Sequence, residues 1–402
     1  MPWKNVSPME QKQQFVSLAA SGRFTVTELC TEFGISRKTG HKWLRRHGED
    51  GMAGLEDRSR APKSVTGRTA YDVERLIVGE RRLHPTWGAK KIRWALEMKH
   101  GLASPPAVST VGAVLTRHGM VKARRRRPGA FKVERGELTE PERCHHILGV
   151  DFKGWFLTGD GERFDPLTVT DLHSRFLMRA EGLPGQTRRW TQESFRALFR
   201  RQGLPEIIRV DNGAPFASMG PGGLSKLSVW WIGLGIRVEF SRPGCPQDNG
   251  SHERMHKTMK AECCKPPSAN PAAQQQRMDR WRKEFNYERP HEALGMRVPG
   301  DVYHPSARRM NERIKPELYE LGVETKTVSS AGFISLGGSS CYVGEAFAGV
   351  DVALERGEKD SLIHVRYANI GLGTLGDSPS ARLRPTASTA RRGNTACATR
   401  KE

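Results

Sequence analysis

The chain has 402 residues and carries 65 Lys or Arg side chains against 44 Asp or Glu, a formal net charge of +21 at pH 7. This length predicts several domains, and the cationic excess favours nucleic acid as a partner, although ribosomal, histone-like and membrane-surface proteins share it. The seven cysteines are irregularly spaced, which argues against a zinc site or a disulfide framework, and no leader or membrane-length apolar run is visible. We therefore expect a cytoplasmic protein with no membrane partner.

Residues 1–48 are predicted to form a helix-turn-helix domain. Ser7, Thr25 and Ser36 stand where helix N-caps are expected, and Gly-Ile-Ser separates the second helix from a cationic third helix over 36–47. This third helix would read DNA. Its predicted DNA contacts are Arg37, Lys38, His41, Lys42, Arg45 and Arg46. The alternative is an ordinary helical hairpin with a solvated basic face.

Residues 49–70 are rich in Gly, Pro and Arg, which predicts a linker. A second helical domain, predicted to bind DNA, follows over 71–122, and a helical spacer is the alternative. Its predicted DNA contacts are Lys90, Lys91 and Arg93. A basic linker is predicted over 123–139, where a dense run of like charges would lie along phosphates. That run consists of Arg124, Arg125, Arg126 and Arg127.

Residues 140–305 are predicted to form an α/β core with a mixed sheet, because short apolar runs alternate with amphipathic stretches. Helices over roughly 250–265 and 271–290 would close this core. Residues 306–372 consist of short alternating runs divided by Gly and Ser, which predicts a small β-barrel. Residues 373–402 are poor in large apolar side chains, which predicts a disordered basic tail.

Three carboxylates stand out because of their sequence context. Asp151 ends the apolar run 147–150, and a buried strand rarely tolerates an unpaired acid. Asp211 ends the run 207–210 and precedes an Asn-Gly turn, and ligands gather at such strand ends in open α/β sheets. Glu253 lies in the first turn of the helix that follows Pro-Gln-Asp-Asn-Gly. These positions make the three acids candidates for one site.

Brought together, two strand-end aspartates and a helix-borne glutamate would supply only oxygen ligands, which suits Mg²⁺ or Mn²⁺ rather than zinc. Two such ions can activate a water or a 3′-hydroxyl and stabilise the leaving oxygen of a phosphodiester. The basic neighbours of Glu253, including His256, would serve the DNA. Lys257 and Lys260 share the helical face of Glu253 and are predicted to contact phosphates, with a plain solvated face as the alternative.

These residues resemble a known family. The strand ending in Asp151, VDNGAPF around Asp211 and PQDNGSHERMHKTMKAE around Glu253 are similar to the Asp-Asp-Glu signature of the retroviral-integrase superfamily, and within it to bacterial insertion-sequence transposases. The resemblance covers about 7–305. It includes HPTWGAKKIRWAL and a closing FNYERPHEALGMRVPG segment whose Arg289 and His291 are predicted to be structural.

The resemblance implies a ribonuclease-H-like core that cuts the ends of a mobile element and joins 3′-hydroxyls to target DNA. Asp151, Asp211 and Glu253 would be its catalytic metal ligands, with two Mg²⁺ or Mn²⁺ ions expected. The implied partner is double-stranded DNA, both terminal repeats and target, near the bacterial nucleoid. Because two DNA ends must be joined, we expect a homo-oligomer of at least two copies.

The spacing departs from the family in one place. Asp211 and Glu253 are 42 positions apart, longer than is usual, and the surplus is predicted to sit in the loop ASMGPGGLSK. Asp171 is predicted to cap a strand turn rather than to be a fourth ligand. Two other functions stay open: a different ribonuclease-H-like nuclease, such as a resolvase, and a DNA-binding regulator that descends from a transposase and has lost catalysis.

Overall fold

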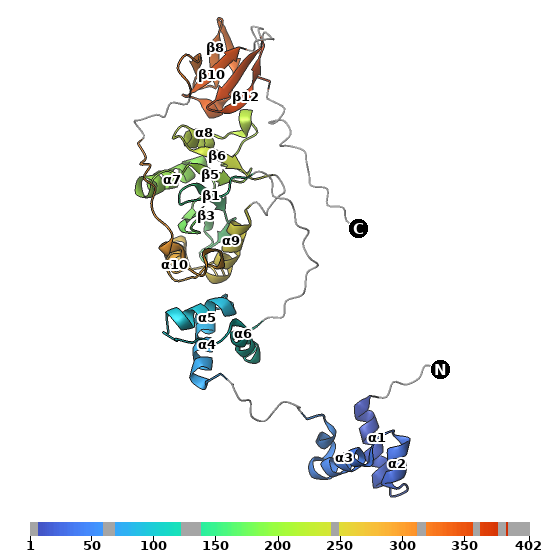
Figure 1. Ribbon diagram of the computed structural model, residues 1–402. Helices are drawn as coiled ribbons and strands as arrows, with labels where there is room; N and C mark the ends of the chain where they lie inside the picture. Colours follow the sequence, from blue (N-terminus) through green and yellow to red (C-terminus); the bar gives the residue numbers. More distant parts are fainter. Residues whose placement is uncertain are drawn as a thin grey trace, which may run out of the picture. The chain divides into compact units, whose positions relative to one another are not determined.

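The computed structural model describes residues 7–58, 69–121, 138–242, 249–311, 319–356, 362–376 and 383–384. The chain divides into two compact units, Met1–Arg68 and Thr69–Glu402 (Figure 1). In the described ranges, no helix combines the length and apolarity needed to cross a membrane. The arginine run 124–127 and nearly all of the predicted tail lie outside the described residues.

The first unit is a compact bundle of short helices. They are α1 (Pro8–Ala20), α2 (Val26–Glu32), α3 (Arg37–Asp50) and the 3₁₀ helix η1 (Gly51–Leu55). Ser7 and Thr25 form capping boxes with Glu10 and Glu28, and Ser36 caps α3, so the predicted N-caps are confirmed. The predicted linker starts too early, because Leu55 is fully buried in this bundle.

The second unit begins with the predicted second helical domain, α4 (Tyr71–Leu83), α5 (Ala89–Met98) and α6 (Val108–Arg117). Their apolar faces meet around Trp87, which is fully buried with Ile77, Ile92 and Val111. Spacings of three and four residues along each helix place these side chains on one stripe. The three helices therefore share one small core of their own.

The predicted α/β core, 140–305, contains the predicted mixed sheet. Its strands are β1 (Ile147–Phe152), β2 (Phe156–Leu157), β3 (Arg163–Asp171), β4 (Leu177–Leu183), β5 (Ile207–Val210) and β6 (Arg237–Phe240). The strand order is β2-β3-β1-β5-β6, with β4 also paired to β3. β1 pairs antiparallel with β3 and parallel with β5, and β5 pairs parallel with β6.

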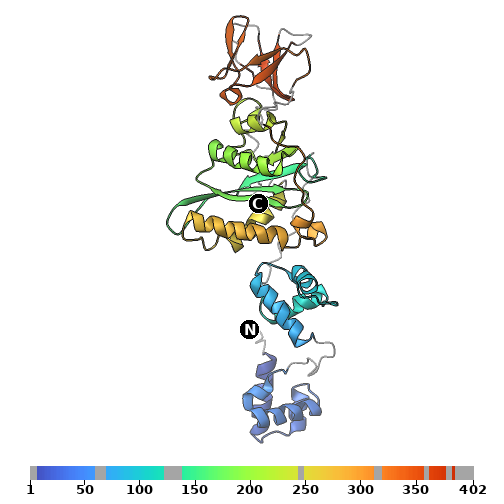
Figure 2. The ribbon, with the colours of Figure 1, turned by 90° about the vertical axis from the view of Figure 1, so that its left-hand side faces the viewer.

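Helices cover both faces of this sheet (Figure 2). They are α7 (Arg188–Gln202), α8 (Lys226–Ile232), α9 (Gly250–Glu262) and α10 (Pro271–Tyr287), followed by the 3₁₀ turns η4 (Glu292–Leu294) and η5 (Pro299–Asp301). On one face, Phe195 and Phe199 of α7 and Trp231 of α8 pack against β1 and β3. On the other, α9 and α10 pack against Phe164 and Leu177.

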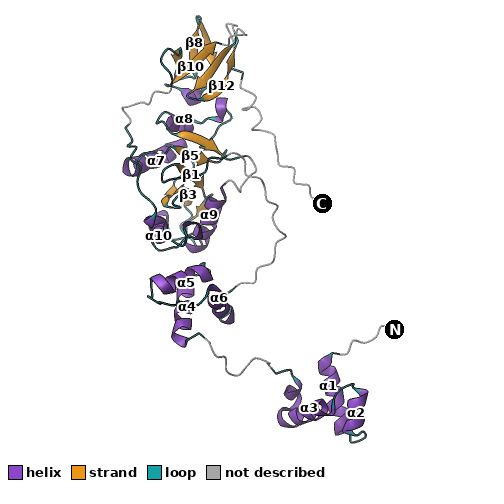
Figure 3. Cartoon of the chain, viewed as in Figure 1, coloured by secondary structure: helices purple, strands orange, loops and turns teal. Residues whose placement is uncertain are grey.

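The C-terminal strands form an open sheet and a hairpin (Figure 3). They are β7 (Thr325–Thr327), β8 (Phe333–Leu336), β9 (Ser339–Tyr342), β10 (Asp351–Arg356), β11 (Ile363–Tyr367) and β12 (Ile370–Leu375), with the 3₁₀ turn η6 (Glu345–Phe347) between β9 and β10. The four-stranded sheet has the order β12-β11-β10-β7, and β8 pairs with β9 alone. Over the described part of 306–372 no closed barrel is found, so the predicted barrel is not confirmed.

The reason lies in what covers the apolar face of the four-stranded sheet. Val229 and Ile232 of α8 pack against Val352 and Leu372, and the Tyr367 hydroxyl donates to the Val229 carbonyl at 3.1 Å. The loop over 217–226, with the 3₁₀ turn η2 (Pro221–Gly223), adds buried Leu224 to the same cluster. The neighbouring core therefore buries the apolar face of the sheet, which closure into a barrel would otherwise bury.

Candidate functional site

Asp151 and Asp211 lie at one edge of the sheet. Asp151 is the second-to-last residue of β1, and Asp211 directly follows β5. The two strands run parallel, and Gly149 lies opposite Arg209. Asp151 and Asp211 each lie two residues further along their strand direction, so the same register places them side by side. Parallel pairing thus converts two sequence-distant acids into neighbours.

Glu253 approaches the same edge from α9. It lies in the first turn of that helix, as predicted, and its side chain is exposed. Burial, the Asp211 carboxylate and, more weakly, the Glu253 carboxylate raise the pKa of Asp151 to about 7. This coupling requires the three carboxylates to be close enough to repel one another. The acids predicted from sequence therefore share one region of the fold.

The carboxylates do not by themselves form a closed ligand group. Among the described residues, no set of three His, Cys, Asp or Glu side chains is arranged to hold a metal ion. The donor chemistry nevertheless fits a hard divalent cation, because three oxygen donors of like charge gather at a partly buried edge. A cation there would relieve the repulsion that raises the pKa of Asp151.

The pH dependence of stability should expose this repulsion in the metal-free protein. The pKa of Asp151 is near 3.8 in an unfolded chain and about 7 in the folded one, so between these pH values the folded chain holds a proton that the unfolded chain releases. Wild-type stability therefore falls as the pH rises from about 4 to 7. Asp151→Asn cannot titrate and should exceed wild type by about 2–4 kcal/mol above pH 7, but not near pH 4.

The measurement is urea unfolding with a chelator at pH values spanning this window. Titrating groups that do not contact or couple to Asp151 are common to both proteins and cancel in the difference between them. A difference that does not change with pH would contradict the raised pKa.

Two histidines lie buried behind Asp151. We predicted His256 to be a basic residue that serves the DNA, and we assigned no role to His252. The Thr168 hydroxyl of β3 is 2.8 Å from His252 Nε2, 2.7 Å from His256 Nε2 and 3.0 Å from the Asp151 carbonyl. His256 Nδ1 is 3.6 Å from Asp151 Oδ2. Because the single hydroxyl proton is donated to the Asp151 carbonyl, both imidazoles must donate to Thr168 through Nε2. This cluster fixes the backbone and side chain of Asp151.

The interpretation of His256 as a cation is wrong. Burial and the neighbouring His252 lower the pKa of His256 to about 2, and burial lowers the pKa of His252 to about 4. Both rings are therefore neutral at physiological pH. The i, i+4 spacing of the pair was visible in the sequence as a single helical face, but the burial of that face was not.

Asp171 is held at the turn between β3 and β4, as predicted. Its Oδ1 accepts from the Ser174 amide and hydroxyl, each at 2.7 Å, and its Oδ2 accepts from the His145 amide at 2.6 Å. Both carboxylate oxygens therefore accept hydrogen bonds within the protein, and the side chain is completely buried. It shapes the turn and is not a fourth ligand.

The predicted DNA contacts lie in different settings. On α3, five are exposed and Arg46 is half-buried, and Lys42 and Arg46 stack on the Trp43 ring. On α9, Lys257 and Lys260 are exposed. On α5, Arg93 is 3.4 Å from Glu97, and Lys90 pairs with Glu292 of the core at 2.6 Å. The structure therefore places Lys90 in a contact between the second helical domain and the core.

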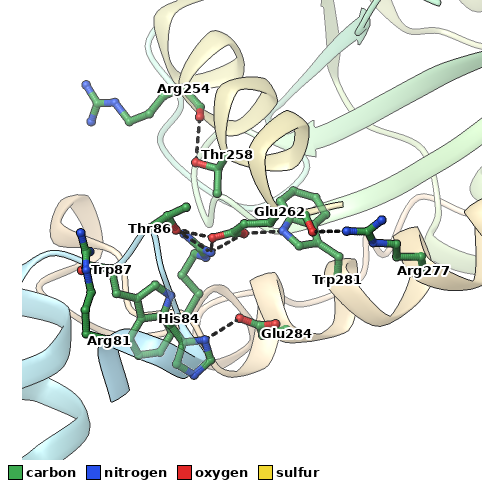
Figure 4. Close-up of polar contacts among 11 residues, drawn as sticks. Arg81, His84, Thr86, Trp87, Arg254, Thr258, Glu262, Arg277, Trp281 and Glu284 are labelled. Atoms are coloured by element: carbon green, nitrogen blue, oxygen red, sulfur yellow. Dashed lines mark hydrogen bonds and ion pairs between the residues drawn. The ribbon is translucent and has the colours of Figure 1, made fainter. Parts of the chain in front are cut away.

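A buried carboxylate anchors this contact (Figure 4). Glu262, at the end of α9, accepts from Arg289, from Trp281 Nε1 at 2.6 Å and from the Thr86 hydroxyl. The side chains of Glu262 and Arg289 are only 14% and 5% exposed. Nearby, His84 Nδ1 is 3.0 Å from Glu284 Oε1. The turn between α4 and α5 is thus held against α9 and α10.

Comparisons with known proteins show which families parts of the chain resemble. The family descriptions Integrase core domain, Homeodomain-like domain and Helix-turn-helix domain match residues 234–299, 39–115 and 11–63. The predicted resemblance to insertion-sequence transposases of the integrase superfamily is therefore confirmed: the chain carries an integrase core domain together with helix-turn-helix domains.

A curated relative is the insertion element IS407 uncharacterized 31.7 kDa protein of Burkholderia multivorans, 24% identical over 184 residues. The match covers 46% of this chain and 64% of that protein. Among solved structures, the HTLV-2 integrase catalytic core domain in complex with magnesium is 14% identical, with a TM-score of 0.33 over 41% of this chain and 100% of that one. A simian T-cell lymphotropic virus intasome with PP2A subunit B56 gamma is 15% identical, with a TM-score of 0.37 over 75% and 100%.

Proposed function

We propose that the protein is a transposase that binds the ends of a mobile DNA element and catalyses metal-dependent cleavage and strand transfer. The observation that carries the proposal is the meeting of Asp151, Asp211 and Glu253 at one sheet edge, with the pKa of Asp151 raised by burial and then by the neighbouring carboxylates. A site whose acids repel one another in this way is suited to a divalent cation.

In this mechanism Asp151, Asp211 and Glu253 would hold two Mg²⁺ or Mn²⁺ ions. Bound ions would activate the attacking water or 3′-hydroxyl and stabilise the leaving oxygen of the phosphodiester. The neutral, buried pair His252 and His256 keeps Asp151 in place through Thr168. Lys257 and Lys260, exposed on the helix of Glu253, hold phosphates near the acids.

Double-stranded DNA is the proposed partner, both element ends and target. The helix-turn-helix units would recognise the ends, and the +21 net charge would supply phosphate contacts. Because two ends must be joined to one target, the working form is an oligomer of at least two copies. Such a substrate places the protein with bacterial DNA, at the nucleoid.

Binding of a labelled duplex by the full chain should weaken steeply with salt, because each neutralised phosphate releases counterions. The logarithm of the association constant should fall linearly with the logarithm of salt concentration, by roughly 0.9 per phosphate contacted. Fluorescence anisotropy across low to moderate ionic strength measures this slope. A flat profile would remove DNA from the proposal, whereas a steep profile without Mg²⁺-dependent nicking would leave only the DNA-binding regulator.

A further inference from the structure

A basic cleft lies on the face of α9 turned away from the proposed metal ligands. The cleft has a volume of about 530 Å³ and is lined by basic side chains from five segments. We call it the junction cleft. Its basic residues are Lys91 of α5, Arg175 of the turn between β3 and β4, Arg209 of β5, Arg254 of α9, and Arg289 with His291 after α10.

Helix geometry separates this cleft from the three acids. Ser251, Arg254 and Thr258 line it, at spacings of three and four residues that place them on one face of α9. At about 100° per residue, Thr258 points roughly 140° away from Glu253 around the helix axis. Figure 4 shows Arg254 and Thr258 along the side of α9 that also bears Glu262. The cleft therefore lies on a different face of α9 from Glu253.

The cleft contains more positive than negative charge. Arg209 pairs with Glu239 at 2.6 Å, and Arg289 pairs with Glu262. Within the described part of the chain, the structure gives no ion pair to Lys91, Arg175 or Arg254. Of the two acids in the lining, Glu292 is already paired with Lys90, and only Glu140 remains. Three cations thus share a partly enclosed space with one carboxylate.

The ionisation of these groups reflects that imbalance. Burial and the charge of Arg289 lower the pKa of Lys91 to about 8, and burial followed by Arg254 lowers the pKa of Arg175. Burial, Lys91 and Arg289 lower the pKa of His291 to about 3. In each case the shift disfavours positive charge: burial is the largest cause and neighbouring cations add to it, while the carboxylates near Lys91 and Arg175 oppose it only in part. An anion in the cleft would reverse these shifts.

The cleft also presents polar groups without partners. In the described structure, Arg289 Nε and His291 Nε2 are buried without a hydrogen-bond partner. Arg175 has a φ of 62°, a left-handed conformation that is uncommon for a non-glycine residue and clusters at functional sites. At the rim, α9 begins without a side-chain cap from Asn249, which leaves first-turn amides available. Of these groups, the Arg289 Nε–H and the helix amides are donors that suit a phosphate, whereas the neutral His291 ring already donates to the Phe285 backbone and offers Nε2 only as an acceptor.

We propose that the junction cleft binds the sugar-phosphate backbone of the DNA substrate, so that one duplex segment contacts the second helical domain and the core together. This rests on the proposed function, because it takes its ligand from the DNA that a transposase binds. Lys91 comes from α5, whereas Arg175 and Arg254 come from the core. Phosphates held between them would strengthen the contact that Glu262 anchors.

The first test removes two of the unpaired charges. Arg175→Gln combined with Arg254→Gln should lower the salt slope for binding a fluorescein-labelled duplex of random sequence by about 1.8, or roughly 0.9 for each lost phosphate contact. The control is Arg189→Gln on α7, an exposed arginine paired with Glu193 on the other face of the sheet. Its slope should match wild type. A double variant with the wild-type slope would overturn the proposal.

The second test detects occupancy of the cleft directly. Amine acylation followed by mass spectrometry should label Lys91 in the free protein, and the same duplex should reduce that labelling at least severalfold. Lys226 of α8, whose side chain is 44% exposed, is the reference and should label equally with and without DNA. In the double variant, protection of Lys91 should largely disappear. Equal labelling of Lys91 with and without DNA would refute the proposal.

Performing the labelling also with Asp211→Asn separates the two proposals. Protection of Lys91 in that variant shows that the cleft binds DNA without catalysis. If wild type protects Lys91 but never cleaves DNA, the catalytic proposal fails and the cleft stands. If wild type cleaves and Lys91 stays unprotected, the cleft fails and the catalytic proposal stands.

Discussion

Asp211→Asn should reduce Mg²⁺-dependent DNA cleavage by roughly a thousandfold or more while leaving DNA affinity close to wild type. The physical reason is that Asp211 stands beside Asp151 at the ends of two parallel strands, where a metal ion would need both carboxylates. Losing one charged ligand removes several kcal/mol of stabilisation of the charge that develops in the transition state. The assay is nicking of a labelled duplex that the full chain selects from a random-sequence pool.

Asp279→Asn is the matched control, because Asp279 is an exposed acid of the same domain, 3.8 Å from Arg282 on α10. It should cleave as wild type does. If Asp211→Asn and wild type nick the duplex at equal rates, the assignment of the metal ligands is wrong, whatever the DNA affinity. If neither protein nicks but both bind, the regulator becomes the better description.

Glu262→Gln should destabilise the second unit by about 3–5 kcal/mol and loosen α4–α6 from the core. Glu262 and Arg289 are both nearly buried, and removing one partner of such a pair leaves the other charge uncompensated. The same carboxylate also accepts from Trp281 and Thr86, so three contacts weaken together. Urea unfolding of the full chain and amide hydrogen exchange in α4–α6 report the two effects.

Glu292→Gln supplies the comparison for this prediction. It breaks the Lys90–Glu292 pair, which also joins the second helical domain to the core but has side chains 59% and 58% exposed. An exposed pair contributes roughly 1 kcal/mol or less. If Glu262→Gln and Glu292→Gln changed stability and hydrogen exchange equally, the buried Glu262–Arg289 pair would not be what holds the second helical domain against the core.

The three acids could be predicted from sequence because each carries a local mark. A carboxylate at the end of an apolar run, or in the first turn of a helix that follows a turn sequence, can be singled out before any contact is known. Their meeting also follows from general rules, since parallel strands bring their carboxyl ends to one edge. The structure places Asp151 and Asp211 as these rules require.

Other features carry no such mark. Neutral His252 and His256 looked like part of a basic helix, and only packing against Thr168 shows that they support Asp151. Lys90 looked like a DNA contact, and its partner Glu292 is 202 positions away. The strands after residue 319 alternate as those of a barrel would, yet α8 covers their apolar face.

The sequence alone determined the helix caps, the apolar runs of the strands, the family resemblance and the choice of three candidate acids, because these depend on neighbours within a few positions. The tertiary structure decided which charges are buried, which pairs anchor the second helical domain and where cations gather without acids. Burial and pairing depend on residues far apart in the chain, as Glu262 with Thr86 illustrates, and no local pattern encodes them.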